Sequence, residues 1–233
     1  DIGNANTTSI TLGKASNART FSTDGATEFT TTGTNPTIDL IGTGVTIKTD
    51  GDLLTFTGGK IDLDNGSNLT IDTGAGNIVL TAIRGDSNET VSITSSGTVD
   101  AQAIGNAHEI ETVEITGGTI ELNGDITTDG DGNVTLTGPV QLGAAVTIDT
   151  SSIDGKGSGD GGNVRFTNKI DSVSGATNAL TITTKAGTVQ VDNIIGSTDA
   201  LGALTINNNA GDTGSITLNG IGDGSPAAGA AAT

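Results

Sequence analysis

One twelve-residue phrase is written twice in this chain, as "LTIDTGAGNIVL" at residues 69–80 and "LTITTKAGTVQV" at residues 180–191. Related phrases begin at Val45, Val91, Val113, Val134 and Leu204. The interval between Val134 and Leu180 is about twice as wide as the others, and we interpret it as two periods with a degenerate copy around Val164-Arg-Phe166. A period of roughly 21 to 24 residues that continues along most of a chain predicts a solenoid.

Each period contains apolar-x-apolar, a turn with Gly or Asn, a second apolar-x-apolar, and a variable stretch. The variable stretch often holds a third apolar pair, such as Ala103-Ile104 or Ile194-Ile195. Three short alternating strands per period fit one coil of a right-handed parallel β-helix. We therefore predict an all-β, right-handed parallel β-helix (β-solenoid) of about ten coils of roughly 21–24 residues, stacked at roughly 4.8 Å per coil. A β-sandwich is the alternative, but the repeated internal phrase favours the solenoid.

The composition constrains what can fill the interior. Gly occurs 37 times, Phe four times, and Trp, Tyr, Met and Cys are absent. Such a chain could be disordered, yet its apolar residues alternate, as in Val45-Thr-Ile47 and Ile61-Asp-Leu63. Alternating β-branched residues bounded by Gly, Asn and Asp indicate short strands and tight turns. A narrow interior of stacked aliphatic side chains also explains why large aromatic residues are missing.

The periodicity divides the chain into three parts. Residues 1–36 contain strand-like segments in poor register, which we predict to be irregular N-terminal coils or a partial cap. Residues 37–221 carry the β-helix repeats, and residues 222–233 form a Gly/Ala/Pro-rich linker or tail. Solenoid ends normally need caps. We find no convincing C-terminal cap, and we expect either a piece of a longer protein or coils that stack on another molecule.

The charge excludes two classes of partner. Nine basic residues stand against 27 acidic ones, which gives a net charge of −18. Such a surface repels phosphate backbones and anionic lipids, so we predict no nucleic-acid binding. No apolar stretch approaches the roughly 20 residues needed to span a bilayer, so we predict no membrane insertion. The lack of cysteine fits a reducing compartment or a secreted protein without disulfides.

The iterated phrase "[LV]-T-I-x-x-x-x-G-x-[IV]-x-[LV]", separated by Gly, Asn and Asp turns, resembles the repeat regions of filamentous-haemagglutinin-like exoproteins and related bacterial adhesins. The resemblance covers roughly residues 37–221. The secretion domain of that family usually carries Asn-Pro-Asn motifs, which only Asn35-Pro36-Thr37 approaches here. The resemblance implies an extracellular or cell-surface, stalk-forming role without catalysis. It carries over no specific functional residues. The implied partners are further copies of the chain, neighbouring domains of a longer chain, or a host-surface or matrix ligand.

One stretch has the pattern of a calcium loop. Asp129, Asp131 and Asn133 place three oxygen-bearing side chains at alternating positions. An EF-hand needs Gly at the sixth position and Glu at the twelfth, and this chain has valines at both. A second Gly/Asp-rich stretch, residues 154–163, resembles the turns of calcium-binding β-rolls but does not repeat. Ordinary turns explain both stretches more simply, so calcium is the lesser interpretation and no other cofactor is predicted.

The densest titratable cluster is formed by His108, Glu109, Glu111 and Glu114. Glu109 and Glu111 alternate along one predicted strand, so they would share a face and could act as paired carboxylates. The same spacing describes a solvated strand face, and no aromatic residue lies nearby to hold a sugar ring. The cluster therefore favours a surface role over catalysis.

A polysaccharide-active lyase or hydrolase is the alternative function, because parallel β-helices host such enzymes. These reactions require Asp residues grouped with Arg or Lys on one face. The basic residues are spread along the chain, and only Arg165 and Lys169 approach a cluster. Outward positions also change freely between repeats, since Thr70 corresponds to Ser92 and then to Glu114. We therefore predict a non-catalytic structural or adhesive segment that could serve as a subunit of an extracellular filament or surface layer.

Overall fold

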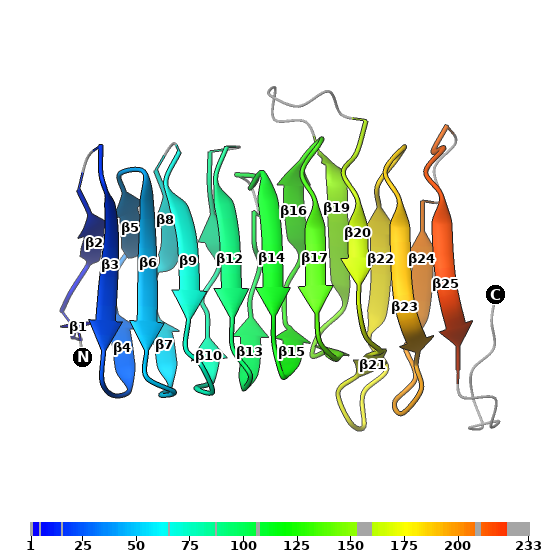
Figure 1. Ribbon diagram of the computed structural model, residues 1–233, viewed down its shortest axis with the longest axis horizontal. Helices are drawn as coiled ribbons and strands as arrows, with labels where there is room; N and C mark the ends of the chain where they lie inside the picture. The colour runs from blue at the N-terminus through cyan, green and yellow to red at the C-terminus, as the bar shows by residue number, and fades with distance from the viewer. Residues whose placement is uncertain are drawn as a thin grey trace.

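The computed structural model describes residues 2–4, 6–14, 16–64, 66–86, 88–105, 108–152, 160–207 and 211–222. Over these residues the regular elements are β-strands, which stack in parallel as a β-solenoid of about eight turns (Figure 1). The predicted all-β parallel solenoid is confirmed, and about ten coils is close to the number found. The described residues include no helix that is long and apolar enough to cross a bilayer.

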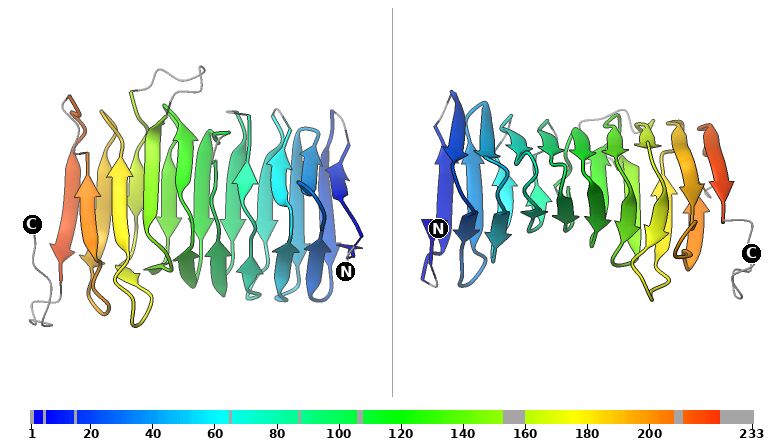
Figure 2. Two further views of the ribbon diagram at one scale, coloured as in Figure 1. Left: turned by 180° about the vertical axis from the view of Figure 1, so that it is seen from behind. Right: turned by 60° about the horizontal axis from the view of Figure 1, so that its bottom comes forward.

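The strands of the solenoid form three faces, which we number in chain order from β3 (Figure 2). Face 1 contains β3 (Ala18–Thr23), β6 (Gly44–Thr49), β9 (Asn68–Asp72), β12 (Thr90–Thr94), β14 (Thr112–Thr116), β17 (Val134–Thr137), β20 (Val164–Phe166) and the first halves of β23 (Val189–Ile195) and β25 (Ile216–Ile221). Face 2 contains β1 (Ile2–Gly3), β4 (Thr27–Thr30), β7 (Leu54–Thr57), β10 (Ile78–Val79), β13 (Thr98–Ala101), β15 (Thr119–Leu122), β18 (Val140–Leu142), β21 (Ile170–Ser172) and the ends of β23 and β25. Face 3 contains β2 (Ser9–Gly13), β5 (Thr37–Ile41), β8 (Lys60–Leu63), β11 (Ile83–Arg84), β16 (Ile126–Asp129), β19 (Val146–Ser152), β22 (Ala179–Thr183) and β24 (Ala203–Ile206).

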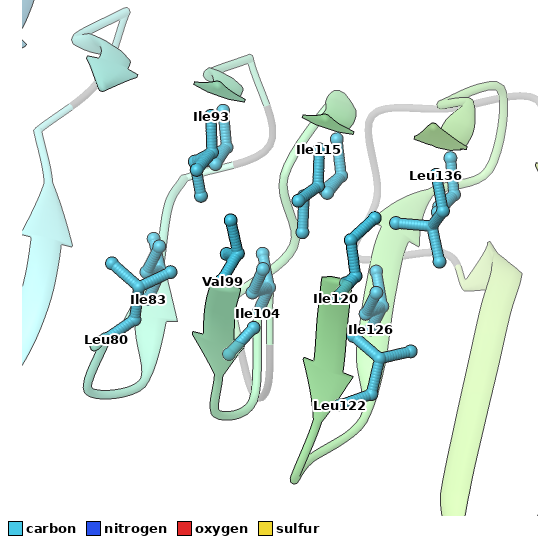
Figure 3. Close-up of a cluster of buried hydrophobic side chains, with 14 of the residues drawn as sticks. Leu80, Ile83, Ile93, Val99, Ile104, Ile115, Ile120, Leu122, Ile126 and Leu136 are labelled. Atoms are coloured by element: carbon cyan, nitrogen blue, oxygen red, sulfur yellow. The ribbon is translucent and has the colours of Figure 1, made fainter. Parts of the chain in front are cut away.

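The core is a set of aliphatic stacks that run along the solenoid axis. In the central turns, Ile93, Ile115 and Leu136 of face 1 stack on one another along the axis. They point into the interior toward a second stack, which Val99 and Ile120 of face 2 form (Figure 3). Face 3 closes the interior with Ile83, Ile104 and Ile126, where Ile104 bridges its two neighbours outside any named strand. All of these side chains are at most 1% exposed. One coil cannot enclose such a core alone, so each turn depends on its neighbours.

The structure corrects the sequence alignment of the repeats. Val134 pairs with Val164, and Val164 pairs with Val189, all on face 1. Leu180 instead pairs with Val146 and Leu204 on face 3. The copy around Val164 is therefore a true face-1 strand, whereas the phrases that begin at Leu180 and Leu204 belong to another face.

The two phrases match in sequence because each forms a corner of the same geometry, although the two corners lie between different faces of the coil. In the first phrase, buried Thr73 donates its Oγ to the Gly76 carbonyl at 2.5 Å and accepts the Gly76 N–H at 3.0 Å through its own carbonyl. In the second phrase, Thr184 and Gly187 make the same two bonds at 2.8 and 2.7 Å. The first corner joins face 1 to face 2, and the second joins face 3 to face 1.

Coil length varies more than the sequence predicted. In the earlier turns, residues that bond across neighbouring coils are separated by 28 positions at Thr31 and Gly59, by 24 at Lys48 and Asp72, and by 22 at Asn68 and Thr90. In the later turns the separation is 30 from Asn133 to Asn163, 25 from Asn163 to Thr188, and 27 from Asp192 to Asn219. Turns longer than the predicted 21 to 24 residues account for the small difference between about eight turns and the predicted ten.

The outer segments are placed as follows. Residues 2–36 contribute β1 to β4, and β2, β3 and β4 pair in parallel with β5, β6 and β7 of the next turn. The N-terminal segment thus contributes strands to all three faces. The predicted tail at residues 222–233 lies outside the described residues from position 223 onward.

Candidate functional site

A cleft of about 500 Å³ lies on face 3. Its floor is a row of outward side chains from four successive strands, because Thr11 pairs with Asp39, Asp39 with Asp62, and Asp62 with Arg84. Each of these residues alternates with buried aliphatic neighbours such as Ile38. The alternation turns the whole row toward solvent on one face. Ile41, Leu63, Asp64, Gly85, Asp86 and His108 complete the lining.

The cleft runs along the solenoid axis, because its lining residues come from consecutive turns rather than from one. From Thr11 in the first turn to His108 in the fifth, four steps of about 4.8 Å give a length of roughly 19 Å. The strands that carry the floor lie behind β3, β6 and β9 in Figure 1 and come to the front in the left view of Figure 2.

An ion pair occupies the middle of the cleft. Arg84 donates from Nε to Asp62 Oδ1 at 2.9 Å and from Nη2 to Asp62 Oδ2 at 2.5 Å. These hydrogen bonds raise the pKa of Arg84 above its ordinary value, against the effect of partial burial, and the charges of Asp62 and Asp39 add to the increase. Within the described residues, no hydrogen bond uses the carboxylate of Asp39. Asp62 is therefore neutralised by its partner, whereas Asp39 presents a free acceptor beside it.

His108 reaches the cleft because face 3 carries extra residues at this turn. Ile104 pairs with Ile126, and Ile110 pairs with Thr128, so a longer stretch in one turn opposes a shorter one in the next. The additional residues include His108, whose carbonyl accepts the Gly85 N–H at 3.2 Å. The insertion therefore places His108 at one end of the cleft.

The same insertion overturns the predicted pairing of Glu109 with Glu111. Glu109 is only 7% exposed and lies next to Ile110, which is fully buried, whereas Glu111 is exposed. Two consecutive buried residues break the alternation on which the prediction relied. Glu114 lies on face 1 between Ser92 and Thr135 and is exposed. The carboxylates of this cluster therefore do not share one face.

The residues of the predicted calcium loop lie at a corner between faces 3 and 1. Asp129 is buried at the end of β16, and its Oδ1 accepts the Gly130 N–H at 2.7 Å. Asn133 Oδ1 accepts both the backbone N–H and the side-chain amide of Asn163, at 2.8 and 3.1 Å. Asp131 is exposed. No group of three or more His, Cys, Asp or Glu that could hold a metal ion occurs among the described residues, and calcium stays a prediction. Residues 154–159 of the second stretch lie outside the described residues.

Asn133 belongs to a hydrogen-bonded ladder that links three turns. Asn163, which donates to Asn133, accepts in turn at its own Oδ1 the Thr188 N–H at 2.8 Å and the Thr188 hydroxyl at 2.7 Å. Asn68 and Asn77 accept the N–H groups of Thr90 and Thr98 in the same way, each at 2.8 Å. Side-chain amides at these positions therefore connect one turn to the next, which is a structural role.

Arg165 and Lys169, the predicted basic pair, point to different partners. Arg165, on face 1, bonds to Asp192 at 2.8 Å, and Lys169, which precedes the face-2 strand β21, bonds to Asp171 at 2.8 Å. Burial opposes ionisation of Asp171, but its bonds to Lys169 and to the Thr198 N–H outweigh that effect and lower its pKa. Both cations therefore act in separate ion pairs.

Sequence reasoning missed the cleft, although the sequence contains a signal for it. The triplets Ile38-Asp-Leu40 and Ile61-Asp-Leu63 are separated by one period of the repeat. They repeat an outward carboxylate as well as the inward residues. Comparisons of the chain with protein-family models, curated proteins and solved structures return no match.

Proposed function

We propose that this chain is a non-catalytic structural and adhesive β-solenoid segment of a secreted or cell-surface bacterial protein. In this role the stacked strands form a stiff rod, and the turns at the corners are displayed to the surroundings. About eight turns at roughly 4.8 Å each give a rod about 38 Å long. A subunit of an extracellular filament or surface layer is the specific form of this proposal.

The observation that carries the proposal is the contrast between inward and outward positions on face 1. Inward residues stay aliphatic or aromatic through every turn, from Val45 to Val189. The outward row beside them changes from Thr70 to Ser92, Glu114, Thr135, Arg165 and Gln190. A constant core with a variable exterior supports a rod, because a rod needs only its core to repeat from turn to turn.

The extracellular location rests on composition and on the resemblance of the repeats to bacterial adhesins. A net charge of −18 with no cysteine suits a chain that is exported without disulfides. The experiment is electron microscopy of the native material together with protease treatment of intact cells. We expect rods or fibres at the cell surface and loss of the protein when cells are treated. A protein retained inside the cell in globular form would refute the proposal.

The cleft on face 3 is the observation that favours a second candidate, a polysaccharide-active enzyme. It brings Asp39, Asp62 and Arg84 together in one axial groove, which is the arrangement that such chemistry requires. Against this, both bonds between Arg84 and Asp62 hold the guanidinium away from an acidic substrate. Product release from neutral and uronate polysaccharides tests this candidate, and turnover abolished by Asp39→Asn would establish it over the structural role.

A further inference from the structure

We propose that the cleft on face 3 binds the guanidinium and ammonium groups of an extended basic polypeptide segment. This inference rests on the proposed adhesive function, because it gives the chemistry of a partner for the rod. The proposal is carried by the shape of the cleft, by its charge, and by an arginine already seated in it.

The first argument is geometric. A volume of about 500 Å³ lies within the range of roughly 300 to 1,000 Å³ in which proteins bind small ligands. The cleft is linear, since one row of side chains from Thr11 to Arg84 forms its floor. A linear site of roughly 19 Å spans about six residues of an extended chain at about 3.3 Å per residue.

The second argument is the identity of the charges. Asp39, Asp62, Asp64 and Asp86 line the cleft with Arg84 as the single permanent cation of the lining. The four carboxylates outnumber the single guanidinium, so the cleft is negative. Carboxylates in a concave surface focus a negative potential and attract cations, and they repel phosphates, uronates and anionic lipids. The partner is therefore positively charged.

The third argument is the ion pair itself, which shows what these carboxylates accept. Arg84 lies on Asp62 with two parallel hydrogen bonds, the fork-to-fork geometry that guanidinium groups form with carboxylates. Asp39 occupies the equivalent position one turn earlier and has no such partner among the described residues. Arg84 thus acts as an internal stand-in for an incoming arginine. It also competes for Asp62, so its removal exposes a second carboxylate to the ligand.

The competition gives a test in which two variants change affinity in opposite directions. The probe is a fluorescein-labelled hexa-arginine peptide, titrated with the intact protein and followed by fluorescence anisotropy at low and at physiological salt. Asp39→Asn is expected to weaken binding and Arg84→Gln to strengthen it, each by roughly two- to fivefold, as for a single partly exposed ion pair. Binding is expected to weaken as salt is raised.

Matched variants separate the cleft from the overall charge. Lys48→Gln removes a cation that is also paired, with Asp72 at 3.2 Å, and that lines a smaller acidic hollow on face 1. Glu114→Gln removes an exposed carboxylate far from the cleft. Neither change is expected to alter the affinity.

Three outcomes would overturn the inference. They are no binding of the peptide at low salt, a gain for Lys48→Gln as large as for Arg84→Gln, or a loss for Glu114→Gln as large as for Asp39→Asn. A neutral oligosaccharide that displaces the peptide and binds more tightly would also overturn it, in favour of a glycan ligand. Circular dichroism of each variant confirms that the fold is retained. Failure here leaves the rod proposal standing, because microscopy and surface location test it independently.

Discussion

Replacing Glu89 is predicted to destabilise the solenoid at one corner. The side chain of Glu89 is fully buried immediately before β12. Its Oε1 accepts the Gly66 N–H at 2.6 Å from the preceding turn, and its Oε2 accepts the N–H groups of Asp86 and Asn88 at 2.6 and 3.1 Å. One carboxylate therefore ties two consecutive corners together.

The magnitude follows from these three bonds. A hydrogen bond to a charged group contributes about 1.5 to 3 kcal/mol. Glu89→Ala removes all three, but the amides of the exposed residues Asp86 and Asn88 can regain water. We therefore expect the free energy of unfolding to fall by about 3 to 4 kcal/mol. Glu89→Gln keeps one oxygen and turns an NH₂ group toward at least one backbone donor. Its expected loss is about 2 to 3 kcal/mol.

The assay is urea unfolding followed by far-ultraviolet circular dichroism, with the slope of the transition used to check that cooperativity is preserved. Glu114→Gln provides the control, since this exposed carboxylate should change stability by less than about 0.5 kcal/mol. Hydrogen exchange at the Gly66 amide supplies a local measurement and should accelerate in both Glu89 variants. If Glu89→Gln unfolds at the same urea concentration as the unchanged protein, the hydrogen bonds of the Glu89 carboxylate contribute nothing to stability and the prediction is wrong.

Three further predictions address close packing, pH and metal. Gly187→Ala should lower the free energy of unfolding by at least about 2 kcal/mol, because a Cβ there would lie 2.1 Å from the Gly162 carbonyl oxygen. Gly25→Ala is the control, because a Cβ at Gly25 would have no atom within 4 Å, and it should leave the urea transition unchanged. The pKa of Asp171 is lowered in the folded protein, so its ion pair with Lys169 stabilises the fold at pH values above the ordinary Asp pKa of about 3.9. This stabilisation is lost as the pH falls through the pKa of Asp171 in the folded protein. Asp171→Asn should consequently lose stability near neutral pH and show a shallower decline in acid. Chelation should leave the melting temperature unchanged, and a fall restored by added calcium would contradict this expectation.

Much of the fold could be predicted because two independent periodicities agree. Alternation along triplets such as Ile61-Asp-Leu63 identifies inward residues, and the repeat interval identifies which of them stack. These two facts suffice for a parallel solenoid with an aliphatic core. They also place Asp39 and Asp62 in one outward row.

The remaining features depend on where chain length changes. His108 enters the cleft only because the turn from Ile104 to Ile110 carries additional residues. The same insertion buries Glu109, which simple alternation places outside. An insertion in one turn shifts the register of everything before the next fixed corner. Sequence spacing alone does not show whether extra residues loop outward or continue the strand.

The repeated phrase carries a more general consequence. Its Thr and Gly specify a corner, and a corner of the same geometry occurs both between faces 1 and 2 and between faces 3 and 1. Two matching phrases therefore have the same local geometry but need not lie on the same face. Leu180 matches Val134 in sequence, yet Leu180 lies on face 3 and Val134 on face 1. Position is fixed instead by the inward stacks, which change little from turn to turn. Outward residues are free to vary, and most rows do vary from turn to turn. Rows of threonine also repeat, as Thr147, Thr181 and Thr205 do, but a row that repeats the same charged residue, as Asp39 and Asp62 do, departs from that freedom. On a rod of this kind such departures mark the surface where binding is to be tested first.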